Sequence, residues 1–424
     1  MANNITSNAD VEVSSITLNT PSGKVLDITS LVTEINIFED LFSPIITGNM
    51  VIVDGGNLFA ATPVLGQEIL TGTIKQGDQT HDFEFRATGI ENVAFENDFT
   101  LSYKVQFVEE SYFVNATTLI SQSYEGSISS IIQRIVEDYL FEEIEIEETA
   151  GNFKVVIPNW NPYKAIRWLM RRAHNENNVP MVCYKTLYNG MQLRSLETLY
   201  GQDAEDIFFY RKKDDSNVTD VENFRSYMQT PKDFSQKRAG DMIDLLNNGA
   251  YASRTQLVDT MNKNYKIFDY SYKDEFEKID HLGPAKFISD NFLVDDKSIY
   301  EHYQTTQKNF IHSGESFGES HMDYNGDVLN SAPHLTSYIK TMSTVEYYLI
   351  ISGRKDIQVG SVIDLDLNQN KPFTRNEISE LNDKRRSGKH IVTSLRHKFD
   401  ANRQYNLVLD VARDTMGADY DEAI

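Results

Sequence analysis

A segment near the end of the chain repeats the pattern of a segment in its first quarter. In the first segment apolar residues alternate strictly with polar ones, which is typical of a strand with one buried face. The second segment carries apolar residues at the same positions, at an offset of 304 residues (405 minus 101). The matched residues are Leu101, Tyr103, Val105 and Phe107, and Tyr405, Leu407, Leu409 and Val411. Such a repeat restricts the chain to folds that use one β-unit twice.

Two further elements occur in the same order in both parts of the chain. An apolar residue precedes a polar turn at Phe95 and again at Phe399, at the same offset. Upstream, a glycine opens a strand in residues 66–69 and in residues 360–363. One alternating match can arise by chance, because any two amphipathic strands align, but three ordered elements favour duplication. We therefore predict an α+β, β-rich fold with two similar antiparallel β-barrel domains and helical or mixed inserted domains.

Between the two β-domains the periodicity changes to that of helices. A stripe of apolar residues with spacings of three and four predicts a helix that begins after Ser127. The pair Asn161-Pro162 predicts the start of a second helix, and Asn189-Gly190 predicts a hairpin turn. The acidic alternation in residues 142–148 is typical of an edge strand with a solvated face. The stripe residues are Ile128, Ile131, Ile132, Ile135, Val136 and Tyr139.

The next part of the chain has a weaker pattern. A third helix is predicted from Pro231 to about Asn247, with Thr230 as its N-cap, and a hairpin from residues 251–258 and 265–272. Residues 276–336 show no regular periodicity. The expected domains are residues 1–115 (first β-barrel), 116–205 (mixed α/β), 206–340 (helix, hairpin and irregular insertion) and 341–424 (second β-barrel).

The composition excludes several classes of protein. Lys and Arg number 40 and Asp and Glu number 63, which gives a net charge of −23 and argues against a protein that grips a phosphate backbone. The single cysteine, Cys183, excludes an intrachain disulfide and a thiolate zinc site, and we expect it to pack as a small apolar residue. No apolar run approaches about 18 residues, so we expect no stable membrane insertion. The N-terminus shows no leader pattern, and we expect the chain to be made in a reducing cytoplasm.

One catalytic motif has to be weighed. Residues 314–318 spell G-x-S-x-G around Ser316, a pattern that exposes a nucleophile only between a strand and a helix. No strand–helix alternation surrounds it here, so we expect a loop and no enzyme. His312 and His321 lack the spacing of metal ligands, and we expect no metal or cofactor. The basic residues 384–386 suit a solvated loop or ion pairs. Trp160 and Trp168 are expected to pack in a core.

The segment that begins at Trp160-Asn161-Pro162 and continues through the helix to Leu169 resembles a segment of a known family. Together with the hairpin around Asn189-Gly190, it is similar to the region after the first barrel in baseplate central hub proteins of contractile-tailed, T-even-like phages. Spike base proteins of type VI secretion are related to these. The matching β-domains at the two ends of the chain agree with this resemblance.

The resemblance implies a structural hub protein whose two β-barrel domains are tail-tube-like. It implies a homotrimer whose two barrels per chain form a ring with pseudo-sixfold symmetry, which adapts a hexameric tail tube and initiator proteins to a trimeric, possibly lysozyme-bearing spike. Baseplate wedge proteins would be further partners, and DNA would pass the acidic channel without specific binding. The location would be the tail baseplate of the virion, after assembly in the host cytoplasm. A tail-associated hydrolase (a serine esterase or a cell-wall-degrading enzyme) and the spike base of a non-phage injection system remain alternatives.

The residues that would serve such a hub are interface residues. Phe38, Leu41, Phe42 and Ile45 form an apolar stretch around Pro44 that a single barrel has no need to expose. We predict that they contact a neighbouring subunit. The alternative is that they close the end of their own barrel.

Overall fold

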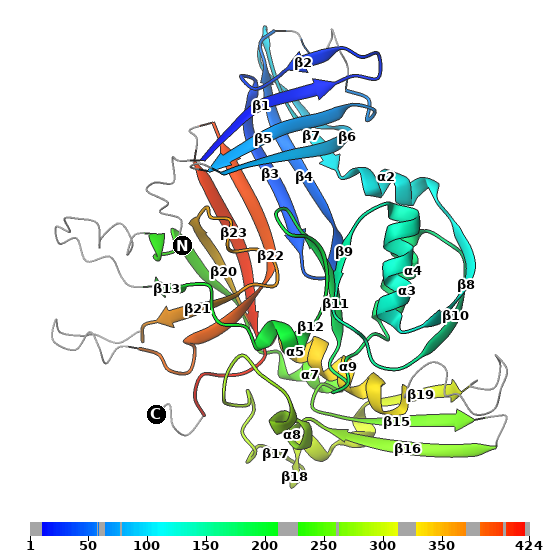
Figure 1. Ribbon diagram of the computed structural model, residues 1–424. Coiled ribbons are helices and arrows are strands. Elements are labelled where there is room, and N and C mark those ends of the chain that lie inside the picture. The colour runs from blue at the N-terminus through cyan, green and yellow to red at the C-terminus, as the bar shows by residue number, and fades with distance from the viewer. Residues whose placement is uncertain are drawn as a thin grey trace.

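The computed structural model describes residues 11–56, 58, 64–76, 79–210, 228–259, 263–312, 328–369, 382–401 and 404–419. Its body is one 13-stranded sheet, with smaller sheets and helices beside it (Figure 1). The predicted β-rich, largely antiparallel class is confirmed. No helix in the described part of the chain is long and apolar enough to cross a membrane.

The first set of strands comes from the N-terminal quarter of the chain. The strands are β1 (Val11–Asn19), β2 (Val25–Asp27), β3 (Val32–Asp40), β4 (Ser43–Asp54), β5 (Ile69–Gln76), β6 (Gln79–Asn97) and β7 (Thr100–Val108). They lie in the order β3-β4-β7-β6-β5-β1-β2, and all these pairs are antiparallel. We call β3 to β7 the first β-unit.

The second β-unit repeats this order with strands that are far apart in the sequence. Its strands are β14 (Asp233–Ala239), β20 (Val345–Ser352), β21 (Val362–Leu367), β22 (Gly388–Asp400) and β23 (Tyr405–Arg413). They pair as β14-β20-β23-β22-β21, strand for strand like β3-β4-β7-β6-β5. Gly66 and Gly360, which precede β5 and β21, share a φ of +86°. The predicted repeat is therefore confirmed in strand order, while closure of each unit into a barrel stays a prediction.

The two β-units are hydrogen-bonded to each other. β3 pairs with β22 in antiparallel register, from Asp40 opposite Ser394 to Glu34 opposite Asp400. β13 (Ile207–Tyr210) extends the second unit by pairing in parallel with β21, at the position where β1 pairs with β5. One hydrophobic core runs through both units. The β3–β22 pairing, which we call the seam, thus joins the two ends of the chain into one sheet.

A helical segment follows the first unit and has its own core. It contains α2 (Glu110–Thr117), β8 (Ile120–Gly126), α3 (Ile128–Ile135), a π-helical turn (Val136–Leu140), β9 (Ile144–Ile146), β10 (Phe153–Trp160), α4 (Pro162–Met170), β11 (Met181–Thr186), β12 (Gly190–Ser195) and α5 (Leu196–Tyr200). Both predicted helices, the hairpin and the edge strand are confirmed. Ser127 accepts a hydrogen bond from the Ser130 N–H as the cap of α3. The hairpin turn is one residue longer than predicted, because Thr186 pairs with Gly190.

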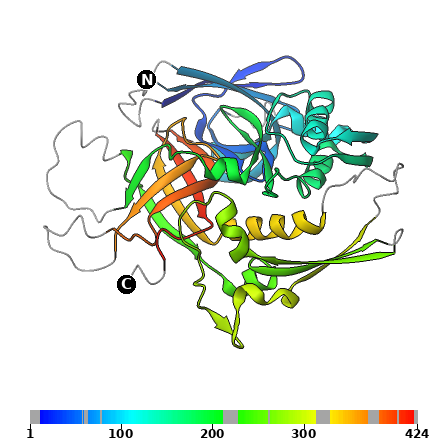
Figure 2. The same ribbon diagram turned by 60° about the horizontal axis from the view of Figure 1, so that its bottom comes forward.

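A third segment packs around α9 (Val328–Met342). It contains α7 (Met242–Asn247), β15 (Ala252–Asp259), β16 (Asn264–Ser271), α8 (Tyr272–Glu275), β17 (Leu293–Val294), β18 (Lys297–Ser298), β19 (Gln307–His312) and 3₁₀ turns at Phe276–Lys278, Ile299–Glu301 and Tyr303–Thr305. Figure 2 shows α9 beside the sheet β16-β15-β19. The predicted hairpin of β15 and β16 is confirmed.

The prediction of one helix from Pro231 to about Asn247 is wrong. Residues 233–239 form strand β14, and only the short helix α7 follows. Gly240, at φ +74°, separates the two, and the cap of the helix is Asp241, not Thr230. Pairing with β20 satisfies the backbone of this strand, and that tertiary interaction outweighs the weak helical pattern.

Candidate functional site: the junction of the two β-units

The accessible side of the seam carries a row of polar contacts. Arg396 on β22 donates from Nε to Asn36 Oδ1 at 2.7 Å and from Nη2 to Glu34 Oε1 at 3.0 Å. Lys398 Nζ lies 3.0 Å from the other oxygen of Glu34. Burial alone would raise the pKa of Glu34, but hydrogen bonds from Asn36 and Lys398 and the charges of Lys398 and Arg396 lower it. The carboxylate of the first unit is thus held by cations of the second.

The core-facing side of the seam contains a buried carboxylate, that of Glu39. Glu39 is only 2% exposed. Its Oε1 accepts from His397 Nε2 at 3.0 Å and from the backbone N–H of Leu187 at 2.6 Å, and its Oε2 accepts from the N–H of Val359 at 3.2 Å. His397 Nδ1 lies 2.8 Å from the hydroxyl of Tyr405. One side chain of β3 therefore binds β22, the β11–β12 hairpin and the segment before β21.

This buried network can position secondary-structure elements, but it cannot contact a substrate. Glu39, His397 and Tyr405 are sealed by the core that surrounds them. A buried carboxylate is tolerable only when donors satisfy its oxygens, as the three donors do here. The arrangement holds three parts of the chain in fixed positions relative to one another.

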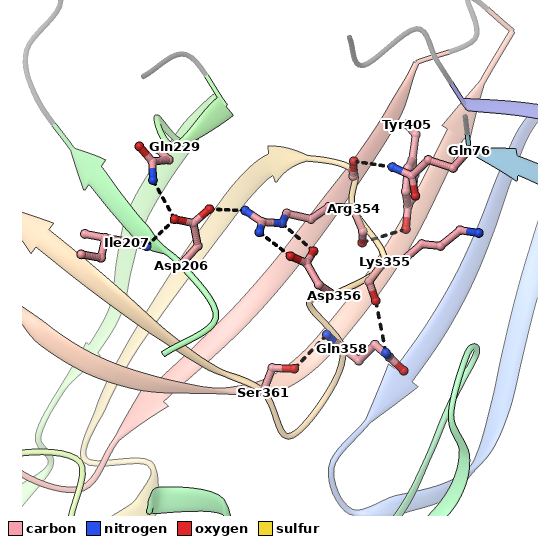
Figure 3. Close-up of polar contacts among 11 residues, drawn as sticks. Gln76, Asp206, Ile207, Gln229, Arg354, Lys355, Asp356, Gln358, Ser361 and Tyr405 are labelled. Carbon is pink, nitrogen blue, oxygen red and sulfur yellow. Dashed lines mark hydrogen bonds and ion pairs between the residues drawn. The ribbon is translucent and has the colours of Figure 1, made fainter. Parts of the chain in front are cut away.

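The loop from residue 353 to residue 361, between β20 and β21, makes a second set of joints (Figure 3). Arg354 pairs with Asp206, which precedes β13, and with Asp356 in its own loop. Gln76 at the end of β5 donates to the carbonyl of Gly353 at 3.4 Å. The loop therefore ties β5 of the first unit to β20 and β13 of the second.

The ion pairs of Arg354 are partly shielded from solvent, so both burial and the partner's charge affect the pKa of each group. Burial alone would lower the pKa of Arg354, but hydrogen bonds and charges of Asp356 and Asp206 raise it. Burial would raise the pKa of Asp206, but Arg354, Gln229 and the N–H of Ile207 lower it. Both groups stay charged and mutually bound throughout the physiological pH range.

A third joint connects the helical segment to the first β-unit. Lys185 on β11 lies between two carboxylates, 2.8 Å from Glu109 Oε1 and 2.8 Å from Glu142 Oε2. Glu109 Oε2 also accepts from the N–H of Ile46 on β4 at 3.2 Å. Burial raises the pKa of Glu109, and the nearby charge of Glu142 adds to this against the lowering effect of Lys185. Burial opposes the charge of Lys185, but the two carboxylates together raise its pKa.

The predicted interface residues lie at the turn from β3 to β4. Leu41 is fully buried in the main core, and its N–H donates to the Thr393 carbonyl of the second unit at 2.9 Å. Ile45 packs against the core of the helical segment. Phe38 lies beside the guanidinium of Arg396. Phe42 is 51% exposed and is the member of the group whose side chain is available to another subunit.

Other residues singled out by sequence have structural roles or lie outside the described ranges. Ser316 and His321 lie outside them, as does the motif of residues 314–318. Cys183 is buried in the core of the helical segment, as predicted, and burial raises its pKa to about 12. Trp160 and Trp168 pack edge to face on each other, and both lie against that core. Within the described ranges, no three His, Cys, Asp or Glu side chains gather as a metal site requires.

Sequence reasoning missed Glu39, His397 and Arg354. A signal for the first two is present. Ile35 and Ile37 are the core-facing residues of β3, so the next core-facing position is that of Glu39. A carboxylate in such a register indicates a buried partner. No comparable signal exists for Arg354, since its partner Asp206 is 148 positions away.

A scan against protein-family models finds no match for this chain, and a search of the curated proteins finds none either. Solved structures do match nearly the whole chain, and the chain has the fold of phage tail proteins. The tail protein from Neisseria meningitidis MC58 matches with a TM-score of 0.53 at 9% identity, over 94% of this chain and 96% of that chain. The 43 kDa tail protein of prophage MuSo2 from Shewanella oneidensis matches with a TM-score of 0.53 at 10% identity, over 96% and 100%.

The resemblance stated from the sequence is thus confirmed at the level of fold. A more distant likeness is to the E. coli c3393 protein, described as a component of the type VI secretion system. It has a TM-score of 0.42 at 7% identity, over 97% of this chain and 78% of that chain, and at this level it supports no conclusion.

Proposed function

We propose that the chain is a structural subunit of a phage tail baseplate, and that three copies form a ring of six β-units. The seam carries this proposal. It joins two units of the same strand order edge to edge within one sheet. The fold shared with phage tail proteins supports the setting. The proposed ring adapts a sixfold tube to a threefold spike, because each chain supplies two like units.

The free edges of the sheet indicate how one chain would join the next. β22 uses one edge for β21 over Gly388–Ile391 and for β3 over Ser394–Asp400. Its counterpart β6 pairs with β5 only as far as Arg86, and on that edge no described strand continues the pairing. β14, the counterpart of β3, ends the sheet, and no described strand pairs with its outer edge. Unpaired strand edges are templates for another chain.

The internal repeat sets the register of the proposed contact. In the seam, Asn36 of β3 lies opposite Lys398 of β22. Lys398 lies opposite Asn406, and its counterpart Ala94 lies opposite Ser102, at the same offset of 304 (406 minus 102). In the first unit, the residue pairs lead from Asn36 on β3 across β4 to a position on β7. The equivalent position on β23 of the second unit leads back across β20 to Ser235 on β14. Ala94 of one copy would therefore face Ser235 of the next.

Closing three such contacts gives a channel lined by an acidic chain. The net charge of −23 favours a passage that repels phosphates, so DNA would pass without specific binding. A trimeric spike protein, hexameric tube and initiator proteins, and baseplate wedge proteins would be the partners. Phe42 is the exposed residue of the predicted interface group and would contact one of these neighbours.

The test of the ring contact is a disulfide between copies. The double variant Ala94→Cys with Ser235→Cys should yield a covalent trimer on oxidation and no larger species. Opposed Cα atoms in an antiparallel pair lie roughly 4.5–5.5 Å apart, within the range a disulfide spans. The native Cys183 is buried and does not interfere. Denaturing gels without reductant separate the products.

Three controls make the result specific. Each single variant should stay uncrosslinked. Ala94→Cys with Gln236→Cys should also fail, because adjacent strand residues point to opposite faces. Asn36→Cys with Lys398→Cys should form a bridge within one chain and run as a monomer, since these residues already pair. A double variant that stays monomeric, or that gives an open ladder beyond three copies, would overturn the proposed ring contact.

The wider proposal is tested by mass in solution. Light scattering should give the mass of three chains, either alone or once the candidate spike protein is added. A chain that stays monomeric with every tail component at micromolar concentration contradicts the structural hub.

A further inference from the structure

A cavity lies at the free edge of the second β-unit. It has a volume of about 240 Å³, whereas one water needs roughly 10–15 Å³ of such space. Its lining comes from β14, β20, the segment around Phe287, the start of β22 with the residues before it, and the end of β23 with the residues after it. Apolar wall residues include Ala239, Phe287, Val345 and Met416, and polar ones include Tyr347, Arg386, His390 and Arg413.

Three of the polar lining groups are buried and have no hydrogen-bond partner among the described residues. Arg413 is 2% exposed, and its Nε has no hydrogen-bond acceptor, although Nη1 donates to the carbonyl of Ser387 at 2.7 Å. The hydroxyl of Tyr347 and Nε2 of His390 are fully buried and likewise unpartnered. Buried polar groups are nearly always satisfied by protein, water or a ligand, so these three have hydrogen-bonding capacity for a molecule that enters the cavity.

The charges around the cavity favour an anion. Among the described carboxylates, none lies within ion-pair distance of Arg413, although Asp414 and Asp364 act on it from farther away. Burial lowers the pKa of Arg413 despite them. Arg386 also lines the cavity, with its Nε on Asp383 at 2.6 Å. The positive charge of Arg413 is thus left without a direct counter-charge.

We propose that this cavity binds a carboxylate carried on a short apolar stem. The Nε–H of Arg413 and the hydroxyl of Tyr347 would donate to the carboxylate, and Phe287 and Met416 would pack against the stem. Two sources share this chemistry: a free aliphatic acid, and an acidic side chain of another protein. The proposal stands apart from the ring contact, because the cavity belongs to a single chain.

Ligand-observed NMR titration with butyrate tests the site on the full chain. Butyrate should bind saturably, and butylammonium should not. Inorganic phosphate, which lacks the stem, should bind at least tenfold more weakly. N-acetyl-glutamate amide distinguishes the sources. If it binds as well as butyrate, a protein side chain is the source; if only butyrate binds, a free acid is. N-acetyl-glutamine amide is the uncharged control.

Two variants locate the binding. Arg413→Gln should weaken butyrate binding about tenfold or more, as expected for a lost hydrogen bond to a charged group. Because Arg413 is buried and this variant can unfold, Ala239→Trp provides an independent test. Ala239 is exposed at the rim, so the indole should block the cavity and leave the fold intact. Arg254→Gln, on β15, should bind butyrate like the unmodified chain. Absent butyrate binding, phosphate binding as tight as butyrate, or binding retained in Ala239→Trp would overturn the proposal.

Discussion

Glu39 occupies a position of β3 where the preceding core-facing residues, Ile35 and Ile37, are apolar. A carboxylate there is stable only because donors from three elements converge on it. Removal of the Glu39 side chain would therefore leave His397 and two backbone N–H groups without their hydrogen-bond acceptor.

We predict that Glu39→Ala lowers the free energy of unfolding by about 3–5 kcal/mol, because it breaks a buried pair and leaves the three donors without an acceptor. Urea titration monitored by circular dichroism measures this. Glu34→Ala, on the accessible side of the same seam, is the matched control and should lose about 1 kcal/mol or less. Equal losses in the two variants would contradict the role assigned to Glu39.

Lys185 allows a prediction about pH. Lys185→Met leaves Glu109 and Glu142 buried without their cation and should lower stability by about 3 kcal/mol at pH 7. Burial already raises the pKa of Glu109, and without the lowering effect of Lys185 its folded pKa lies further above the unfolded one. The loss is therefore absent below the unfolded pKa and grows as pH rises through the folded pKa, so it should shrink between about pH 7 and pH 4.

Thermal unfolding of the Lys185→Met variant and the unmodified chain across this range shows the trend. Glu109→Gln is the control. It keeps the Lys185–Glu142 pair, so no buried charge is left without a partner, and it should cost clearly less than Lys185→Met. A Lys185→Met deficit that does not vary with pH would refute the explanation.

Among single residues, the sequence predicted those whose local pattern carries the information. Ser127 as a cap and Cys183 as a core residue follow from their neighbours alone. Glu39 and Arg354 owe their roles to residues more than a hundred positions away, which no local pattern contains. The same limit applies to Phe38, Leu41 and Ile45, because their neighbours in space come from other parts of the chain.

At the scale of elements, strong periodicity was a reliable guide and mixed periodicity was not. The stripe of α3 and the hairpin of β15 and β16 were predicted correctly. Residues 231–247 were predicted as a helix, although their first half is β14. An edge strand with little burial has no clear alternation, and only the presence of β20 decides its conformation.

The glycines that open β5 and β21 make an element-scale prediction. Gly360 has a φ of +86°, and a Cβ there would lie 2.9 Å from the hydroxyl oxygen of Tyr184. Gly360→Ala should therefore lose more than the about 1–2 kcal/mol that a left-handed backbone alone costs. Gly151→Ala, at φ +77° with no neighbouring atom within 4 Å, measures the backbone effect alone. Chemical denaturation of both variants compares them, and a smaller loss at Gly360 would contradict the close contact.

At the scale of the whole molecule, the duplication of the β-unit was the property best predicted. The repeat between the segments at Leu101 and Tyr405 identified β7 and β23, which occupy equivalent places in the two units. What the repeat did not reveal is that the units share a sheet. Amphipathic alternation states which face of a strand is buried, but it says nothing about which strand lies at its edge.

The shared sheet predicts cooperative unfolding of the two β-units. Because one core and one seam span both, they should melt in a single transition, with coincident near- and far-ultraviolet dichroism. Separate transitions for the two units, seen for example in hydrogen exchange of β7 and β23, would contradict this. The helical segment, which has its own core, is the internal reference and can melt apart.

The seam also has a mechanical consequence. Backbone hydrogen bonds in a sheet run across the strands, so tension around the circumference of the proposed ring would pull along these bonds. Seven residue pairs, from Asp40–Ser394 to Glu34–Asp400, would share that load at once and would have to fail together. Pressure from within the channel would therefore act on a closed ring in which the seam inside each subunit resists opening in the same way as the other strand pairs of the sheet.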